Sequence, residues 1–195
     1  MAGEKYIVAA TDNSLQIAVR NILNPNGYMF LENCSDAISL MRLVRTFHPD
    51  FIVMDVGIQL SDARNTLETI DDEMLCASVL LGENKDIGIF SIIEKSNAIS
   101  YCPKPLNRDI FLHTVVMANI NYKRVSGLDK KLKDMTDNYE TRKLVERAKW
   151  ILMERDGLSE KDAYERMRKK SMDGRMSMKT IAESIIFTNE ATGKG

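Results

Sequence analysis

The first 122 residues of the chain alternate between short apolar runs and segments whose apolar residues recur at helical spacing. Helical patterns occupy residues 14–27, 36–47 and 87–96, and another begins near Asn107. The apolar runs, each typical of a buried strand, are "KYIVAA", "YMFLEN", "FIVMD", "SVLLG" and "ISYC". This alternation predicts an α/β domain over residues 1–122, with a flavodoxin-like, doubly wound, five-stranded parallel sheet and helices on both faces.

The carboxyl ends of the predicted strands carry polar residues, and function in such sheets is found at these ends. Thr11 and Asp12 follow the first strand, Asp55 ends the third, Gly82 ends the fourth and Lys104 follows the fifth. Two carboxylates can hold Mg²⁺ through oxygen, one can attack a phosphorus atom, and a lysine can balance the charge gained. We therefore expect a phosphoryl-transfer centre with Asp12 and Asp55 as Mg²⁺ ligands and Asp55 as phosphoacceptor.

Two short motifs in this half of the chain carry a resemblance to a known family. "FIVMD" ends in the acidic residue, and "YCPKP" places Tyr101 three residues before Lys104. Residues 4–122 resemble the receiver domain of response regulators. The resemblance implies a cis Lys104-Pro105 peptide, a role for Tyr101 in signalling, and a sensor histidine kinase as partner.

This chain also departs from the receiver pattern at two positions. The family has two adjacent acids after strand one and a Ser or Thr after strand four, where this chain has Thr11-Asp12 and Gly82. Losing a carboxylate weakens the metal site, and losing the hydroxyl removes the group that couples phosphorylation to Tyr101. A receiver kept as a scaffold for dimerisation or protein contact is favoured over a phosphorylated one.

Residues 123–140 form a charged segment with a sparse apolar pattern. Val125, Leu128, Leu132, Met135 and Tyr139 are separated by 3, 4, 3 and 4 positions. This spacing predicts a helical coiled-coil linker with a parallel homodimer seam. The alternative is an amphipathic helix that lies on the receiver-like domain, and Gly127 could interrupt its start.

A second apolar face follows on the same predicted helix, because no Pro or Gly occurs between Leu128 and Asp156. At helical spacing, one face collects five apolar residues: Leu144, Val145, Ala148, Ile151 and Leu152. Trp150 lies nearly opposite them, above Leu132, and Met153 lies above Met135. We interpret Trp150 and Met153 as an extension of the dimer seam. The alternative is that the Trp150 ring stacks on a nucleic-acid base.

Residues 141–195 predict a small domain of three helices. Gly157 ends the first, Ser159 with Asp162 begins the second, and Ser177 begins the third. These residues carry a net charge of +4, whereas residues 1–122 carry −6. Candidate phosphate contacts gather there: Arg142, Lys149, Arg166, Arg168, Lys169, Lys170, Arg175 and Lys179. The charge alone equally fits a solvated surface.

The segment "ERAKWILMERDGLSEKDAYERMRKKSMDGRMSMKTIAESII" resembles the ANTAR domain, the RNA-binding antiterminator module of bacterial regulators. Trp150 departs from it, because the family usually carries Gly there. The resemblance implies binding to paired stem-loops in nascent mRNA, which stops a terminator hairpin from forming. Looped-out bases offer edges and stacking faces, and a dimer presents two modules to two loops. By position and charge, we expect RNA contacts from Lys149, Arg168, Lys169 and Lys179.

Other features narrow the class of protein. No apolar run approaches the ~18 residues of a membrane span, and the start lacks a signal peptide. Three widely spaced cysteines, Cys34, Cys76 and Cys102, argue against disulfides and zinc. His48 and His113 lie away from the predicted site, and no nucleophile–base pair is apparent. We expect a cytoplasmic regulator that is not an enzyme.

Two other functions compete with the antiterminator interpretation. One is a DNA-binding response regulator in which "MDGRMS" is the turn of a helix-turn-helix. The other is a receiver-based interaction module that binds a partner protein and no nucleic acid. The activating signal also stays open: it can be phosphoryl transfer, a small ligand or an inhibitory partner protein.

Overall fold

The computed structural model describes residues 3–58, 60–83, 91–96 and 98–192 of the chain. The chain divides into two compact units, Met1–Leu128 and Asp129–Gly195. Of the helix expected at residues 87–96, the first part lies outside the described residues, and residues 91–93 are helical.

The first unit is built on a five-stranded parallel sheet, as the alternating pattern predicts. The strands follow the order β2-β1-β3-β4-β5. Their bounds are β1 (Lys5–Ala9), β2 (Met29–Cys34), β3 (Phe51–Asp55), β4 (Ala77–Gly82) and β5 (Ile99–Pro103). The change of direction at β1 brings the carboxyl ends of β1 and β3 side by side, which is where such folds place their sites.

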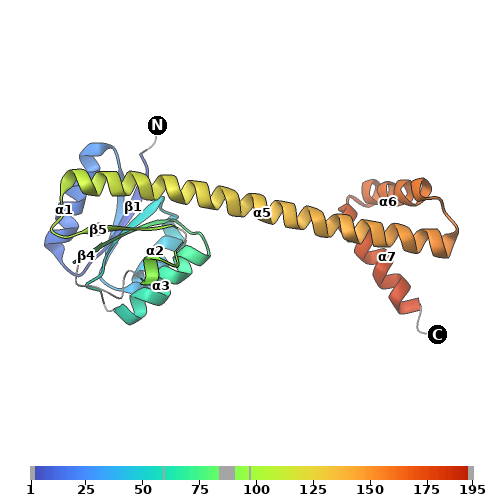
Figure 1. The fold of residues 1–195 in the computed structure, drawn as a ribbon, viewed down its shortest axis with the longest axis horizontal. Helices are drawn as coiled ribbons and strands as arrows, with labels where there is room; N and C mark the ends of the chain where they lie inside the picture. Colours follow the sequence, from blue (N-terminus) through green and yellow to red (C-terminus); the bar gives the residue numbers. More distant parts are fainter. Residues whose placement is uncertain (1–2, 59, 84–90, 97, 193–195) are drawn as a thin grey trace. The chain divides into compact units, whose positions relative to one another are not determined.

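Helices cover both faces of this sheet (Figure 1). They are α1 (Asn13–Leu23) with the short 3₁₀ helix η1 (Asn24–Asn26), α2 (Ala37–Phe47), α3 (Leu60–Asp72) and the beginning of α5 (Arg108–Asp156). One buried cluster joins the sheet to α1 and α5, and another joins it to α2 and α3. The sequence pattern does not predict α3, because few apolar residues, chiefly Leu67 and Ile70, mark its buried face.

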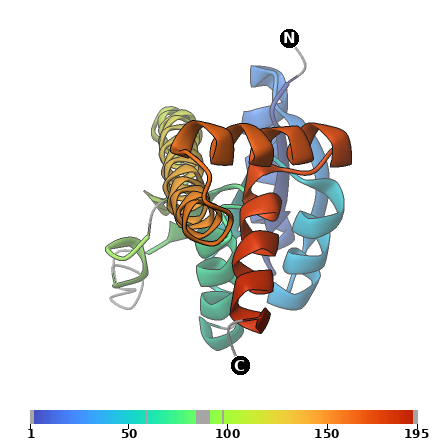
Figure 2. The same ribbon diagram turned by 90° about the vertical axis from the view of Figure 1, so that its right-hand side faces the viewer.

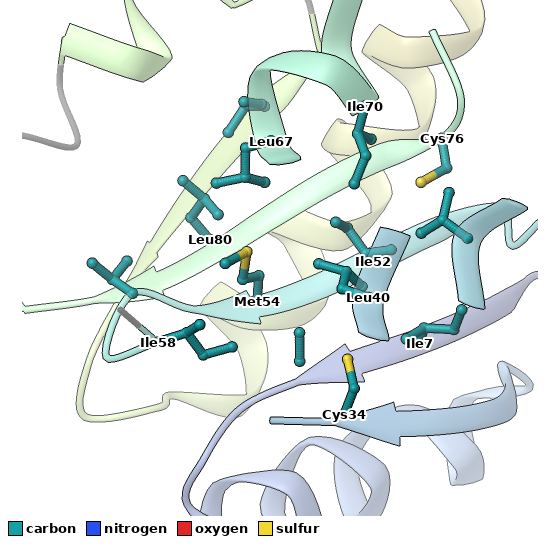
Figure 3. Close-up of a cluster of buried hydrophobic side chains, with 14 of the residues drawn as sticks. Ile7, Cys34, Leu40, Ile52, Met54, Ile58, Leu67, Ile70, Cys76 and Leu80 are labelled. Carbon is teal, nitrogen blue, oxygen red and sulfur yellow. The ribbon is translucent and has the colours of Figure 1, made fainter. Parts of the chain in front are cut away.

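The buried cluster under α2 and α3 is shown in Figure 3. Ile52 and Met54 point from β3 toward Leu40 of α2 and Ile70 of α3, and all four are almost completely buried. Burial of each such side chain stabilises the fold by about 1.5–3 kcal/mol. On the other face, the rings of Tyr6 and Phe51 stack with centroids 5.5 Å apart. These two layers fix the strand ends that carry the candidate site.

Asp side chains start two of the helices. The carboxylate of Asp12 accepts a hydrogen bond of 2.8 Å from the amide of Ser14, and Asp36 accepts one of 2.8 Å from Ser39. Such caps satisfy amides that have no partner within the helix. Asp12 therefore serves as the cap of α1.

The helix α5 runs unbroken for 49 residues, from Arg108 to Asp156. The last helix of the receiver-like domain, the expected linker and the first helix of the C-terminal domain are thus one element. Gly127 lies inside it without a break. A Cβ at this position would meet nothing within 4 Å, so close packing does not require a glycine here.

The second unit consists of the C-terminal part of α5 with α6 (Glu160–Gly174) and α7 (Met178–Thr192). In Figure 2, α6 runs across the end of α5 and α7 turns away from α6. The buried core is Val145, Ala148, Ile151, Leu152, Ala163, Met167, Ile181, Ala182, Ile185 and Ile186. The apolar face predicted for the first helix is therefore confirmed.

The turns of this unit follow the sequence signals closely. Gly157, with φ of +65°, ends α5 in the left-handed region that favours glycine. Ser159 then caps α6 by accepting a hydrogen bond of 3.2 Å from the amide of Asp162. Ser177 likewise accepts one of 3.1 Å from the amide of Thr180 at the start of α7.

Candidate functional site

Asp55 and Lys104 meet at the carboxyl edge of the sheet. Asp55 ends β3, is only 5% exposed, and its Oδ1 lies 2.5 Å from Lys104 Nζ. The same oxygen accepts a hydrogen bond of 3.2 Å from the Gly57 amide. The backbone amide of Lys104 donates to the Gly82 carbonyl at 2.8 Å, and the Lys104-Pro105 peptide is cis. The structure thus brings together the expected Asp55, Lys104 and Gly82.

Three other residues expected at this site have different surroundings. Thr11 and Asp12 are both exposed, and the Asp12 carboxylate is engaged by the Ser14 amide. Tyr101 is partly buried and packs against the apolar cluster under α2 and α3. Its ring is therefore part of the core on that side of β5.

The donors at this edge do not fit a Mg²⁺ site of the receiver kind. Mg²⁺ needs oxygen ligands in a strict octahedral arrangement. Thr11 stands where the receiver pattern has a second carboxylate, and the exposed Asp12 carboxylate is bonded to the Ser14 amide at the start of α1. Within the described residues, no group of three or more His, Cys, Asp or Glu is placed to hold a metal ion.

In the second unit, Lys149, which the sequence predicts as an RNA contact, is buried between two acids. Its side chain is only 10% exposed, and Nζ lies 2.9 Å from Glu146 Oε2 and 2.7 Å from Glu160 Oε1. The hydrogen bond to Glu160, followed by the one to Glu146, raises the pKa of the ammonium above its ordinary value of 10.5. Lys149 therefore joins α5 to the start of α6, and we remove it from the set proposed for RNA contact.

Arg166 is also engaged within the unit. Its Nη1 lies 2.7 Å from Asp156 Oδ2, and Arg155 Nε lies 2.7 Å from Asp156 Oδ1. The hydrogen bond from Arg155, with the added charge of Arg166, holds the pKa of Asp156 below its ordinary value of 3.8. Asp156 thus links the end of α5 to the middle of α6.

The other expected cations are free to meet a polyanion. Arg142, Arg168, Lys169, Lys170 and Arg175 are exposed and Lys179 is partly exposed. Among the described residues, none of these six makes an ion pair with an acid. Five of them lie on α6, on α7 or in the turn between, so the uncompensated positive charge is centred on this helix pair.

The expected dimer seam is an exposed apolar face of α5. Six residues form it, with exposed fractions from 37% to 72%: Leu128, Leu132, Met135, Tyr139, Trp150 and Met153. Scattered apolar residues on a surface are ordinary, but a regular row of them indicates an interface.

Sequence reasoning missed the partners of Lys149. Glu146 precedes it by three positions on one helix, a spacing that brings side chains together and that the sequence displays. Glu160 belongs to the next helix, so its approach depends on how α6 packs.

A family model gives the class of the second unit. Residues 133–186 match the model of the ANTAR domain. The chain therefore combines a receiver-like α/β domain with a C-terminal ANTAR domain.

A relative aligns with this chain over nearly its whole length. The chain is 24% identical over 184 residues to the transcriptional regulatory protein PdtaR of Mycobacterium tuberculosis strain H37Rv, covering 94% of this chain and 90% of that protein. Among the described residues, no helix is long and apolar enough to cross a membrane.

Solved structures resemble the first unit and support its fold. The receiver domain of a modulated diguanylate cyclase from Desulfovibrio desulfuricans G20 aligns with a TM-score of 0.55 at 17% identity, covering 62% of this chain and 97% of that one. The N-terminal domain of a response regulator/sensory box/GGDEF protein from Carboxydothermus hydrogenoformans gives 0.54 at 21% identity, covering 62% and 98%.

Proposed function

We propose that this protein is a transcription antiterminator of the response-regulator type, which binds paired stem-loops in nascent mRNA and so prevents a terminator hairpin from forming. The observation that carries the proposal is the ANTAR match over residues 133–186, where exposed cations without acidic partners surround α6. Cations of this kind contact phosphates, while looped-out bases provide the features that a protein can distinguish.

The charge on α7 favours RNA over the DNA-binding alternative. In a helix-turn-helix, the helix after the turn enters the major groove between two phosphate backbones. Here that helix is α7, whose exposed side chains after Lys179 include Glu183 and Glu190. Carboxylates on the inserted helix would repel the backbone, so α7 is poorly suited to this role.

We also propose that two copies pair in parallel through the seam on α5. A parallel coiled coil places the same apolar residues of two helices against each other. The side chains of the row, Leu128, Leu132, Met135 and Tyr139, carry no charge. Lys, Asp and Glu residues on either side of them keep the edges of the row in water. Pairing would hold two ANTAR domains on one molecule and raise the effective concentration of the second at a neighbouring loop.

For the receiver-like domain, we propose a regulatory role without catalysis. Thr11 in place of a second carboxylate, Gly82 in place of a hydroxyl residue and the poor fit to Mg²⁺ favour a scaffold that contacts a partner over a phosphorylation-driven switch. The partner would be an inhibitory protein or a sensor histidine kinase, and we place the protein in the cytoplasm.

The first experiment is a titration of the full chain into labelled RNA that carries two adjacent stem-loops. Duplex DNA and unrelated RNA serve as competitors at a fixed salt concentration, because phosphate contacts depend strongly on salt. Binding that resists both competitors supports the antiterminator function. Preference for duplex DNA supports the DNA-binding alternative, and affinity for neither polymer supports the protein-interaction alternative.

A further inference from the structure

Besides Tyr139, which belongs to the apolar row from Leu128 to Tyr139, the described part of the ANTAR-containing unit exposes three aromatic side chains that its core does not need. They are Trp150 on α5, Tyr164 on α6 and Phe187 on α7, with exposed fractions of 59%, 45% and 72%. Exposed rings on a nucleic-acid-binding domain are natural stacking surfaces for unpaired bases. Because a base arrives with its phosphates, the charges one helical turn from each ring decide which ring can receive it.

Trp150 and Phe187 each have an acid without an ion pair one turn away. Glu154 lies one turn after Trp150 and Glu183 one turn before Phe187, and both are exposed. The other acids one turn from these rings, Glu146 and Glu190, are paired with Lys149 and Arg147. The unpaired carboxylates repel phosphates, and no unpaired cation lies one turn from either ring in the described residues, so neither is placed to receive an RNA base.

Tyr164 has the opposite surroundings. Lys161 precedes it by three positions and Arg168 follows it by four, so both lie one turn away on the same side of α6. Both cations are exposed, and in the part of the chain that the structure describes neither pairs with an acid. Among the exposed rings of this unit that the structure describes, Tyr164 is therefore the one with an unpaired cation one turn away on each side.

The two sides of α6 differ in charge. At ~100° per residue, Lys161, Tyr164, Arg168 and Met172 fall within about 80° of one another. Met172 is 68% exposed and extends the apolar part of this flank. The remaining cations of the helix are Arg166, Lys169 and Lys170. Arg166 and Lys169 fall on the opposite flank by the helical projection, together with the acids Asp162 and Asp173, and Lys170 falls between Arg166 and the buried stripe.

Acids near the Tyr164 flank are few and one is neutralised. Glu160 lies between Tyr164 and the buried stripe of α6, and its carboxylate is bound by Lys149 at 2.7 Å. Glu165 lies at the outer edge, next to Met172 on the helical projection. The buried Lys149 thus removes a negative charge from the side of Tyr164 that faces the domain.

We propose that Tyr164, Arg168 and Lys161 form a base-reading site on α6. The ring of Tyr164 stacks on a base that is turned out of an RNA loop, and the two cations bind the phosphates on either side of that base. This inference rests on the proposed function and deepens it, because it names the surface that meets the loop. Stacking on one ring contributes about a tenfold gain in affinity.

The test compares variants of the full chain for binding to one labelled RNA stem-loop. Tyr164→Leu keeps the apolar volume but loses the flat ring, so we expect affinity to fall about tenfold at every salt concentration. Tyr164→Phe keeps the ring and should bind like the wild type. Arg168→Gln should weaken binding and lower the slope of log affinity against log salt by about one.

Phe187→Leu is the matched control, because it removes a more exposed ring that has an acidic neighbour, and it should leave RNA affinity unchanged. Photo-crosslinking of wild-type protein to 4-thiouridine in the loop gives a readout that needs no variant. We expect the crosslink in the peptide that contains Tyr164, and a crosslink confined to other peptides overturns the site.

The outcomes separate the two proposals. Wild-type protein without selective RNA binding refutes the proposed function and, with it, this site. Selective binding by the wild type that Tyr164→Leu leaves unchanged overturns the base-reading site and leaves the antiterminator function standing.

Discussion

Lys149 Nζ of α5 lies 2.7 Å from Glu160 Oε1 in the first turn of α6, and this contact joins the two helices of the ANTAR-containing unit. The Glu160 carboxylate also lies at the amino end of α6, where its negative charge interacts favourably with the helix dipole. A cation chosen from its position in a basic segment is thus part of the internal structure. The cations left for RNA are those without such a partner.

Replacing Lys149 with Met should destabilise the second unit without a specific loss of RNA contacts. The variant keeps the buried aliphatic stem but loses both ion pairs, and we expect about 1–2 kcal/mol less free energy of unfolding. Lys169→Met is the control, because Lys169 is exposed on the same helical pair without an acid partner; its effect should stay within about 0.5 kcal/mol. Denaturant unfolding measures both. Unchanged stability combined with weaker RNA binding would return Lys149 to the interface.

Acidification should loosen the start of α6. The hydrogen bond and charge of Lys149 hold the pKa of Glu160 below its ordinary value of 4.5. A carboxyl with a lowered pKa in the folded state contributes stability above its unfolded pKa and loses it as the pH falls through the folded one. Thermal unfolding followed from neutral pH to below 4.5 should show this loss. Glu160→Gln should flatten the dependence, whereas Glu165→Gln, on the exposed side of α6, should leave it unchanged.

The sequence predicts those features that depend on local periodicity. The apolar runs mark all five strands, and the spacing of Val145, Ala148 and Leu152 marks the buried face of α5. Asp55 and Lys104 meet as expected, because parallel strands end at the same edge. Burial of Lys149 could not be predicted, since its partner Glu160 reaches it only after α6 packs. The same applies to α3, whose apolar residues are too few to mark a helix.

Glutamate in place of Leu132 should separate a dimer. The side chain is 64% exposed on α5 and lies in the middle of the apolar row. A charge there would face the same charge on the second copy, and like charges in an apolar seam oppose pairing. Sedimentation at several concentrations should give a dimer for wild type and a monomer for the variant. Ile38→Glu, at an 80% exposed apolar position on α2, is the control and should stay dimeric. A monomeric wild type would contradict the seam.

Thiol reagents should react slowly with the native protein. Burial raises the pKa of Cys34 and of Cys76 to about 12, so the reactive thiolate is scarce near neutral pH. Reaction at pH 8 should become fast only in denaturant, as followed by thiol titration. These raised values also predict that stability is retained below the ordinary pKa of 9.0 and declines as the pH rises above it. Rapid labelling of the folded protein would show that at least one cysteine thiol is more accessible to solvent than the structure indicates.

Thr11→Asp should increase the phosphorylation of Asp55 in the receiver-like domain. The wild type presents Asp12 as the one carboxylate after β1, and Asp55 is bound to Lys104. A second carboxylate at the exposed position 11 would supply the missing oxygen ligand and allow Mg²⁺ to compete with the ammonium for Asp55. With a small acyl phosphate and Mg²⁺, we expect intact-mass analysis to show little modification of wild type and clear modification of Thr11→Asp. Adding Asp55→Asn to Thr11→Asp should abolish it. Equal and complete modification of the wild type would contradict the scaffold role, because it would show that Asp12 and Asp55 suffice to bind the metal and activate the acceptor.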